Sequence, residues 1–224
     1  MFSSLTRLHC RYIAIHCLDT LITEFTGSNG EEEEENENEN ENTESSFQEL
    51  FNDIPSVLCL SIQSNLPHPR IIYCGLRTLL SFFDPEICSK KICAPFGENI
   101  LNFCLTLYLN ADLPMFVRAE CASVLGNVSI LSSEKVSRAK YSEIARSFET
   151  IISSPSGENN NSVKNQNGSN SAHDESLLKA KSLEGFALIG RAVGKKIFLP
   201  DALRLLELFV EKHRQVCVCV CVCV

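Results

Sequence analysis

Three stretches of this chain share one pattern, and this repetition limits the possible folds more than any other feature. The first two are PHPRIIYCGLRTLLSFF from Pro67 and LPMFVRAECASVLGNVSIL from Leu113. Each has proline at a turn, then an arginine near the start of an apolar segment, then small residues and a leucine. Aligning Ile71 with Val117 gives a spacing of 46 residues. The pattern predicts a structural unit that occurs more than once.

A third copy, LLKAKSLEGFALIGRAVG, follows a low-complexity segment. Its Gly190 aligns with Gly126 at a spacing of 64 residues. Residues 155–173 are rich in Asn, Ser and Gly, and removing these 19 positions reduces the spacing to 45. We therefore expect this segment to be a disordered insertion. A unit of about 45 residues matches HEAT and armadillo repeats, in which helix pairs bury their apolar faces by stacking on neighbouring pairs.

Apolar residues recur at spacings of three and four along most of the chain, which predicts helices, and no convincing alternating strand lies between them. Turn sequences such as NLPHPR at 65–70 and NADLP at 110–114 separate the helices, and Pro200 follows the last glycine-rich one. The predicted helices cover about residues 5–26, 47–64, 70–83, 96–109, 114–131, 135–154, 175–197 and 200–214. We expect an all-α fold, a HEAT/armadillo-type α-solenoid over residues 1–214, with about four antiparallel helix pairs in a right-handed superhelix truncated at both ends.

The segment KSLEGFALIGRAVGKKIF, residues 181–198, contains glycines before a lysine pair and so invites a nucleotide-binding interpretation. A P-loop needs four residues between its glycines and then Lys-Ser/Thr, and neither possible frame here satisfies this. A helix is the better interpretation. Its predicted apolar face contains Leu183, Phe186, Ala187, Gly190, Val193 and Ile197, and the small residues Ala187, Gly190 and Gly194 would let a neighbouring helix approach closely.

Charge is distributed unevenly along the chain. The formal net charge is −8, and nine of the acids lie in the segment Glu31–Glu44, which has no lysine or arginine. The rest of the chain is nearly neutral and lacks the basic footprint that nucleic-acid binding requires. We expect a disordered acidic insertion at 27–46. It could contact a basic partner electrostatically, through residues that include Glu31, Glu32, Glu33, Glu34 and Glu35.

Eight of the twelve cysteines lie outside the last eight residues, and no two of them form a Cys-x-x-Cys motif. Most lie on apolar faces of predicted helices, so we expect reduced thiols packed in the core. The five histidines have no carboxylate at motif spacing, and we expect no catalytic residues, metal or cofactor. The N-terminus lacks the small-residue cleavage site of a signal peptide, and no apolar stretch is long enough to cross a membrane. We therefore expect an intracellular protein.

The C-terminal tail, residues 215–224, reads QVCVCVCVCV. Perfect alternation of this kind could form an aggregation-prone strand or a soft-metal site. An uninterrupted GT dinucleotide repeat in DNA also encodes alternating valine and cysteine. We interpret the tail as translated repeat DNA that joined the coding sequence through read-through or a gene-model artefact, and the chain as a fragment.

The segment LLKAKSLEGFALIGRAVGKKIFLPDALRLLELF resembles a repeat of the importin-beta family of nuclear transport receptors, especially its beta-3 branch. The family pattern is a Leu-Ile-Gly and Ala-Val-Gly-Lys helix before a Phe-x-x-Asp-Ala turn, which here ends at Phe198, Asp201 and Ala202. The segment HPRIIYCGLRTLLSFF from His68 also looks like a family helix, with Ile72 where the family usually has a cation. The positions that carry the family motifs are Arg70, Arg118, Gly126, Lys181, Gly190 and Gly194.

The resemblance implies a carrier from the middle of a longer HEAT-repeat array that shuttles between cytoplasm and nucleus. Such a receptor holds nuclear-localisation-signal cargo on its concave side, touches Phe-Gly nucleoporins on its convex side, and releases cargo when the GTPase Ran binds. The mechanism would be a shift between solenoid curvatures, driven by differential affinity. The alternative is a HEAT-repeat scaffold for another complex, such as a phosphatase or a vesicle coat.

Overall fold

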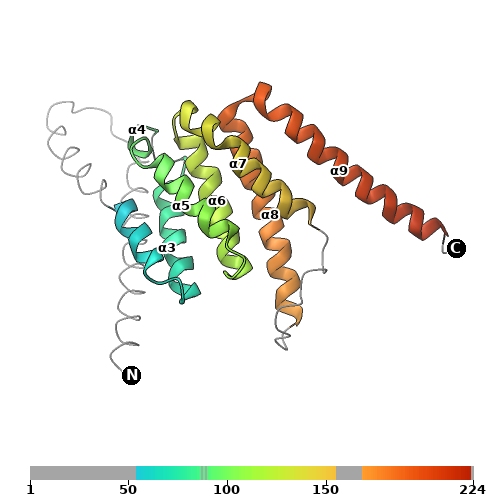
Figure 1. Ribbon diagram of the computed structural model, residues 1–224, viewed down its shortest axis with the longest axis horizontal. Helices are drawn as coiled ribbons and strands as arrows, with labels where there is room; N and C mark the ends of the chain where they lie inside the picture. The colour runs from blue at the N-terminus through green and yellow to red at the C-terminus, as the bar shows by residue number, and fades with distance from the viewer. Residues whose placement is uncertain (1–53, 87, 89, 155–167, 223–224) are drawn as a thin grey trace, which may run out of the picture.

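The computed structural model describes residues 54–86, 88, 90–154 and 168–222, and this part of the chain is all-helical, with no strand (Figure 1). The first described helical segment covers residues 54–63. The elements that follow are α3 (Pro69–Phe82), α4 (Lys90–Cys93), α5 (Gly97–Leu109), α6 (Met115–Leu131), α7 (Glu134–Ser153), α8 (Gly168–Val193) and α9 (Lys195–Val222). The predicted all-α class is therefore confirmed.

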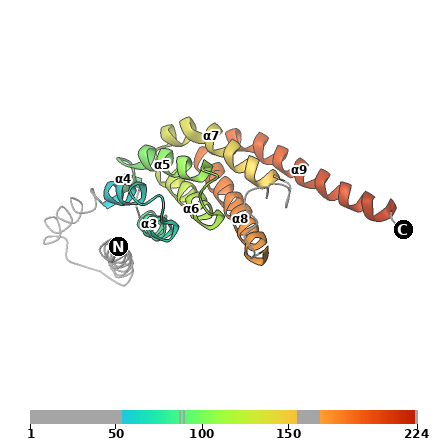
Figure 2. The same ribbon diagram turned by 60° about the horizontal axis from the view of Figure 1, so that its bottom comes forward.

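The helices stand side by side in two rows, which Figure 2 shows most clearly. One row contains α3, α6 and α8, with α6 packed between the other two. The second row contains α5, α7 and α9, with α7 packed against both of its neighbours. Helix α5 also packs on α6, and α7 packs on α8. This arrangement is compatible with an α-solenoid.

Local sequence signals account for the helix starts. Pro69 lies in the first turn of α3, where its missing N–H costs nothing, and Pro114 is the N-cap of α6. The Ser133 hydroxyl caps α7 by accepting a hydrogen bond from the Val136 N–H. The N-caps of α3 and α6, His68 and Pro114, are 46 residues apart, which equals the spacing found in the sequence. The bounds predicted for α3, α5, α6 and α7 are correct to within one residue at each end.

The centre of the core is aromatic. Tyr108 of α5 and Phe148 of α7 are both fully buried, and their rings meet edge to face with centroids 5.3 Å apart. The Tyr108 hydroxyl forms a 2.8 Å hydrogen bond with the hydroxyl of Ser182 on α8. The Tyr108 side chain thus joins α5 to both α7 and α8, and its hydrogen-bond partner Ser182 lies 74 positions further along the chain.

The prediction of one continuous helix over 175–197 is wrong. Helix α8 ends at Val193, and α9 begins at Lys195. The residue between them, Gly194, has φ of +86°, a left-handed conformation that glycine adopts easily. Gly194 is therefore a helix terminator and takes no part in a close helix crossing, because a Cβ atom built on it would have no neighbour within 4 Å.

The predicted buried face of this helix is correct only in part. Phe186, Gly190 and Val193 are buried, whereas Leu183 and Ala187 are exposed. The close crossing with the neighbouring helix lies at Gly185, where an added Cβ would come within 2.8 Å of the Ala122 carbonyl oxygen on α6. On α6 the facing glycine is Gly126, whose added Cβ would lie 3.2 Å from Gly185 Cα. Gly126 and Gly185 together therefore form the close crossing between α6 and α8.

Three further predictions differ from the structure. Pro200 was expected at the start of a new helix, 200–214, but lies inside α9. Helix α9 continues to Val222, so the tail is helical to that residue, and the alternative of a strand there does not hold. Helix α4 was not predicted. Helix α8 begins at Gly168, inside the expected 155–173 insertion. The predicted helix at 5–26 and the acidic insertion at 27–46 lie outside the described residues, and the division into repeat units with two insertions stays a prediction.

Candidate functional site

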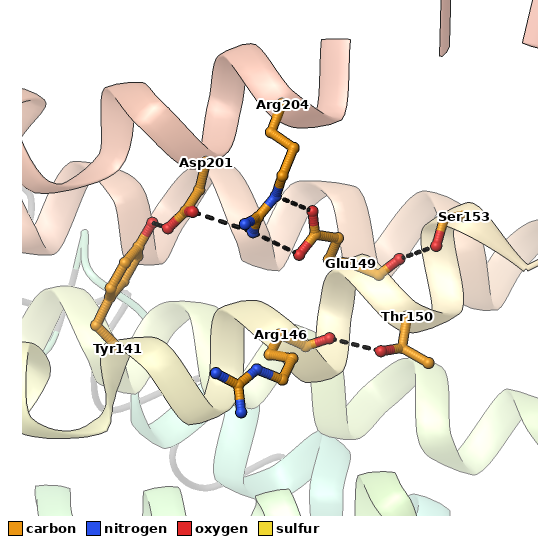
Figure 3. Close-up of polar contacts among 7 residues, drawn as sticks. All are labelled: Tyr141, Arg146, Glu149, Thr150, Ser153, Asp201 and Arg204. Carbon is orange, nitrogen blue, oxygen red and sulfur yellow. Dashed lines mark hydrogen bonds and ion pairs between the residues drawn. The ribbon is translucent and has the colours of Figure 1, made fainter. Parts of the chain in front are cut away.

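A group of four polar side chains joins α7 to α9, and we call it the α7–α9 clamp: Tyr141, Glu149, Asp201 and Arg204 (Figure 3). Arg204 donates two hydrogen bonds of 2.7 Å, one to each carboxylate oxygen of Glu149. The Arg204 Nη2 atom also lies 3.1 Å from Asp201 Oδ1. The other oxygen of Asp201 accepts a 2.6 Å hydrogen bond from the Tyr141 hydroxyl. Both carboxylates thus have partners within the clamp.

Electrostatics within the clamp favour this pairing. Burial raises the pKa of Tyr141 above its ordinary value, and the hydrogen bond to Asp201 and its negative charge raise the pKa further. The hydrogen bonds and charge of Glu149 raise the pKa of Arg204. Tyr141 therefore stays a neutral donor and Arg204 stays a cation. The clamp contains no nucleophile activated by a neighbouring base, and its geometry is suited to fixing the direction of α9 relative to α7.

A second polar feature recurs in two successive helix pairs. Arg118 of α6 donates a 2.8 Å hydrogen bond from Nε to the Tyr108 carbonyl, in the last turn of α5, and its guanidinium lies 5.8 Å from the Tyr108 ring centre. Lys179 of α8 donates a 2.9 Å hydrogen bond to the carbonyl of Ser154, the C-cap of α7. Each cation satisfies a carbonyl that the helix end leaves open and meets the negative end of the helix dipole.

The positions proposed to carry the family motifs do not gather at one site. Arg118 lies in the contact just described, and Gly126 lies in the α6–α8 crossing. Arg70 is exposed, and Lys181 forms a surface pair with Glu184 at 2.8 Å. Gly190 is buried and packs under the Phe198 ring, which an added Cβ would meet. Gly194 terminates α8.

The repeat alignment explains why Arg70 has no structural role comparable with that of Arg118. With the 46-residue offset, Ile72 takes the position of Arg118, and Ile72 is fully buried. Lys179, and not Lys181, makes the contact to the preceding helix end.

Sequence reasoning missed most of the clamp. Asp201 was noted through the family resemblance, but Tyr141, Glu149 and Arg204 were not. Glu149 and Arg204 are 55 positions apart, and Tyr141 and Asp201 are 60 positions apart. No local sequence motif predicts contacts over such separations. One indirect signal exists: Glu149 and Tyr141 are eight residues apart on one helix, on the same side as the buried Phe148 and Ala145.

The cysteines of the described residues behave as core side chains. Cys88, Cys93, Cys104 and Cys121 are buried, while Cys59 and Cys74 are partly buried. Burial raises the pKa of the Cys59 and Cys93 thiols to about 12 and that of Cys88 to about 11. Thiols with such raised pKa values are poor nucleophiles at neutral pH, which agrees with a packing role.

Other candidate groups are isolated or lie outside the described residues. Within the described ranges no cluster of His, Cys, Asp and Glu could hold a metal ion, and no helix is long and apolar enough to span a bilayer. His173 lies 3.9 Å from its neighbour Asp174 on a surface turn of α8. The proposed acidic contact residues Glu31 to Glu35 lie outside the described residues.

Comparison with family models, with curated proteins and with solved structures finds no match to this chain.

Proposed function

We propose that this chain is an α-solenoid whose stacked helix pairs bind other proteins, and that it acts in nuclear transport as a receptor of the importin-beta kind. The solenoid part is supported by the two helix rows and by the 46-residue offset between the starts of α3 and α6. The transport part is supported by the sequence resemblance over Lys181–Phe209.

One observation gives the strongest support to the solenoid part of the proposal. In two successive helix pairs, α5–α6 and α7–α8, a cation from the second helix binds a carbonyl at the end of the first helix. The two cations, Arg118 and Lys179, are not at aligned positions, because the alignment of Gly126 with Gly190 places Ser182 opposite Arg118, so what recurs is the kind of contact. Repetition of one kind of contact, here a cation bound to a helix-end carbonyl, is expected when a stack consists of similar units that touch only their neighbours.

The proposed partners are a cargo with a basic nuclear-localisation signal, Phe-Gly nucleoporins and Ran. An array of helix pairs with many small contacts can change curvature, and a ligand that prefers one curvature shifts the population towards it. Release of cargo by Ran requires that the two ligands prefer different curvatures. No residue of this chain needs to perform covalent chemistry for that function.

The test uses protein expressed from the natural transcript alongside the 224-residue chain. Binding of a basic cargo peptide is measured with and without Ran loaded with a non-hydrolysable GTP analogue. We expect Ran in its GTP form to displace the cargo from the natural protein. Cargo binding that does not respond to Ran would contradict the transport role and leave the alternative of a HEAT-repeat scaffold for a phosphatase or coat complex.

A further inference from the structure

Four exposed cations gather at one corner of the helix rows, and we call them the basic corner: Lys135, Arg191, Lys195 and Lys196. Lys135 lies in the first turn of α7, Arg191 lies in the last turn of α8, and the other two lysines begin α9. None of the four forms an ion pair with another residue that the structure describes. Their positive charge therefore has no counterpart within the described part of the chain.

Three helix ends meet at this corner because neighbouring helices alternate in direction. Lys179, in the first half of α8, binds the Ser154 carbonyl at the end of α7, so these two helices run in opposite directions. The α7–α9 clamp pairs residues in the same order along both of its helices, so α7 and α9 run in the same direction. The start of α7, the end of α8 and the start of α9 therefore lie at one edge of the rows (Figure 1).

The acids nearest the basic corner already have partners. Glu134 pairs with Arg138 in the first turns of α7, and Asp201 of α9 belongs to the clamp. On α8 the nearest acid, Glu184, pairs with Lys181. The N-termini of α7 and α9 add partial positive charge at the same edge. The basic corner therefore attracts negative charge more strongly than a single surface lysine would.

The rest of this edge is balanced in charge. The exposed Lys90 and Lys91 of α4 lie close in the chain to two exposed acids, Glu86 and Glu98. The positive excess is therefore confined to the basic corner. Further repeat units would stack beside α9, and stacking leaves the helix ends at this edge in contact with solvent.

The acidic segment Glu31–Glu44 precedes a helix that starts on the same edge. This helix, residues 54–63, comes before α3 and is joined to it by the short connection 64–68, and its Ile62 contacts Gly75 of α3. It therefore runs antiparallel to α3, and Ile54 lies on the side where α3 ends and where α5, α7 and α9 begin (Figure 1). The segment contains nine glutamates and no lysine or arginine.

The length of chain between the segment and the fold is sufficient for contact. With α5 and α7 between helix 54–63 and α9, three helix spacings of about 8–10 Å give a separation of roughly 30 Å along the edge. The residues that connect the acidic segment to Ile54, 45–53, span up to about 30 Å when extended. Glutamates earlier in the segment extend the reach further.

We propose that the acidic segment Glu31–Glu44 binds the basic corner of the same chain, so that each shields the other from charged groups of other molecules. Each exposed pair contributes little and is screened by salt. Tethering compensates for this, because it gives the segment an effective concentration in the millimolar range at the corner. This inference goes beyond the transport proposal and does not depend on it.

The test uses a fluorescent peptide with the sequence of residues 31–44, titrated at low ionic strength and followed by anisotropy. One titration uses the parent chain, and the other uses a full-length variant with Glu→Gln at all nine glutamates of the segment, which we call the glutamine variant. We expect the peptide to bind the glutamine variant and to bind the parent about tenfold more weakly, because the parent's own segment competes. Physiological salt should weaken both.

A matched pair of changes, each made in the glutamine variant, locates the site. Lys195→Glu/Lys196→Glu should weaken peptide binding at least about tenfold, and acids in the first turn of α9 suit the helix dipole. The control Arg70→Glu/Arg146→Glu changes the net charge equally at two exposed cations that also form no ion pair with a described residue, and it should leave binding nearly unchanged. Circular dichroism and thermal melting check that both variants fold.

Three titration results would overturn the proposal: no binding to the glutamine variant, equal binding to the parent and the glutamine variant, or equal weakening by the control. Equal binding would mean that the corner is open to acidic chains of other proteins. Self-association of the parent in sedimentation velocity that Lys195→Glu/Lys196→Glu abolishes would also overturn it, because a second copy would then supply the segment. The titration contains neither Ran nor cargo, so either proposal can fail while the other stands.

Discussion

The contact between α6 and α8 and the contact between α7 and α9 are built in opposite ways. The first is dry and close: Gly126 and Gly185 face each other, and buried aliphatic and aromatic side chains surround them. The second depends on the polar clamp at the surface, where the Arg204 side chain is 58% exposed. The first contact lies in the middle of the helix rows, and the second holds the helix that leaves them (Figure 1).

The two contacts should contribute differently to the stability of the chain. A close crossing between two backbones has little freedom to relax, so added volume there strains the whole stack. An exposed ion pair contributes little and is screened by salt. We therefore expect α6 and α8 to form the stable centre, and α9 to be the element whose direction changes most readily.

Alkaline pH should have the largest effect, because it acts at once on several buried or partly buried thiols of the helical core, among them Cys59 of the 54–63 helix and Cys93 of α4. Thiols ionise near pH 9 in the unfolded chain, whereas the folded pKa is about 12 for Cys59 and Cys93. The stability is therefore fully present below pH 9 and is lost as pH rises towards 12, because the unfolded chain releases protons that the folded chain retains.

Melting temperature measured by circular dichroism against pH checks this prediction. We expect a steady fall above pH 9, and a Cys93→Ala variant should show a shallower fall. A melting temperature that stays level across this range would mean that the thiols are accessible to solvent and that the core is looser than described.

The variants Gly185→Ala and Gly190→Ala each add a methyl group to α8. At Gly185 the new methyl group meets the backbone of α6, and at Gly190 it meets an aromatic side chain. A Cβ at Gly185 would lie 2.8 Å from the Ala122 carbonyl, which belongs to a packed helix, while a Cβ at Gly190 would meet the ring of Phe198, which is only partly buried. We expect a loss of about 2–3 kcal/mol for Gly185→Ala and a smaller loss of about 1–2 kcal/mol for Gly190→Ala, where the partly buried Phe198 side chain must shift as a whole, because the added Cβ meets its Cγ as well as the ring edge.

Urea denaturation of the two variants and the parent chain gives both free energies of unfolding. Each change adds a similar gain in helix propensity, so the comparison isolates the packing cost. A larger loss at Gly190 would show that Phe198 is fixed and that the joint between α8 and α9 is as rigid as the centre.

Substitution of Gly194 tests the joint between α8 and α9. Its φ is +86° and no atom would lie near an added Cβ, so the cost of substitution comes from the backbone alone. Gly194→Ala should destabilise the chain by about 1 kcal/mol, and Gly194→Asn by less, because asparagine tolerates the left-handed region better. Equal losses for the two variants, measured by thermal melting, would contradict a purely conformational cause.

The smallest effect should come from the clamp. A double-mutant cycle with Glu149→Gln and Arg204→Met should give only a small coupling free energy, because the arginine is exposed to solvent. The coupling should shrink further at high salt. A coupling larger than the Gly194→Ala effect that salt does not change would mean that the clamp is shielded from solvent and belongs to the stable centre.

Helix positions and class were accessible from the sequence, because the signals that set them are local. Proline at the starts of α3 and α6, the serine cap of α7 and apolar spacing of three and four all act within one or two turns. The repeat spacing was accessible for the same reason. Of the α7–α9 clamp, only Asp201 could be singled out from the sequence, through the family resemblance, because the other three residues belong to no motif.

Local sequence patterns are enough to predict that this chain forms helices, where most of them start and end, and that the pattern recurs after 46 residues. The buried face of α8 depends instead on the packed fold, because Leu183 and Phe186 are both apolar and just one side of the helix meets α6 and α7. The packed fold also decides that Gly185 makes the crossing and that Gly194 ends the helix. Hydrophobicity is a property of each residue, whereas the choice of partner depends on surfaces that become neighbours only after folding.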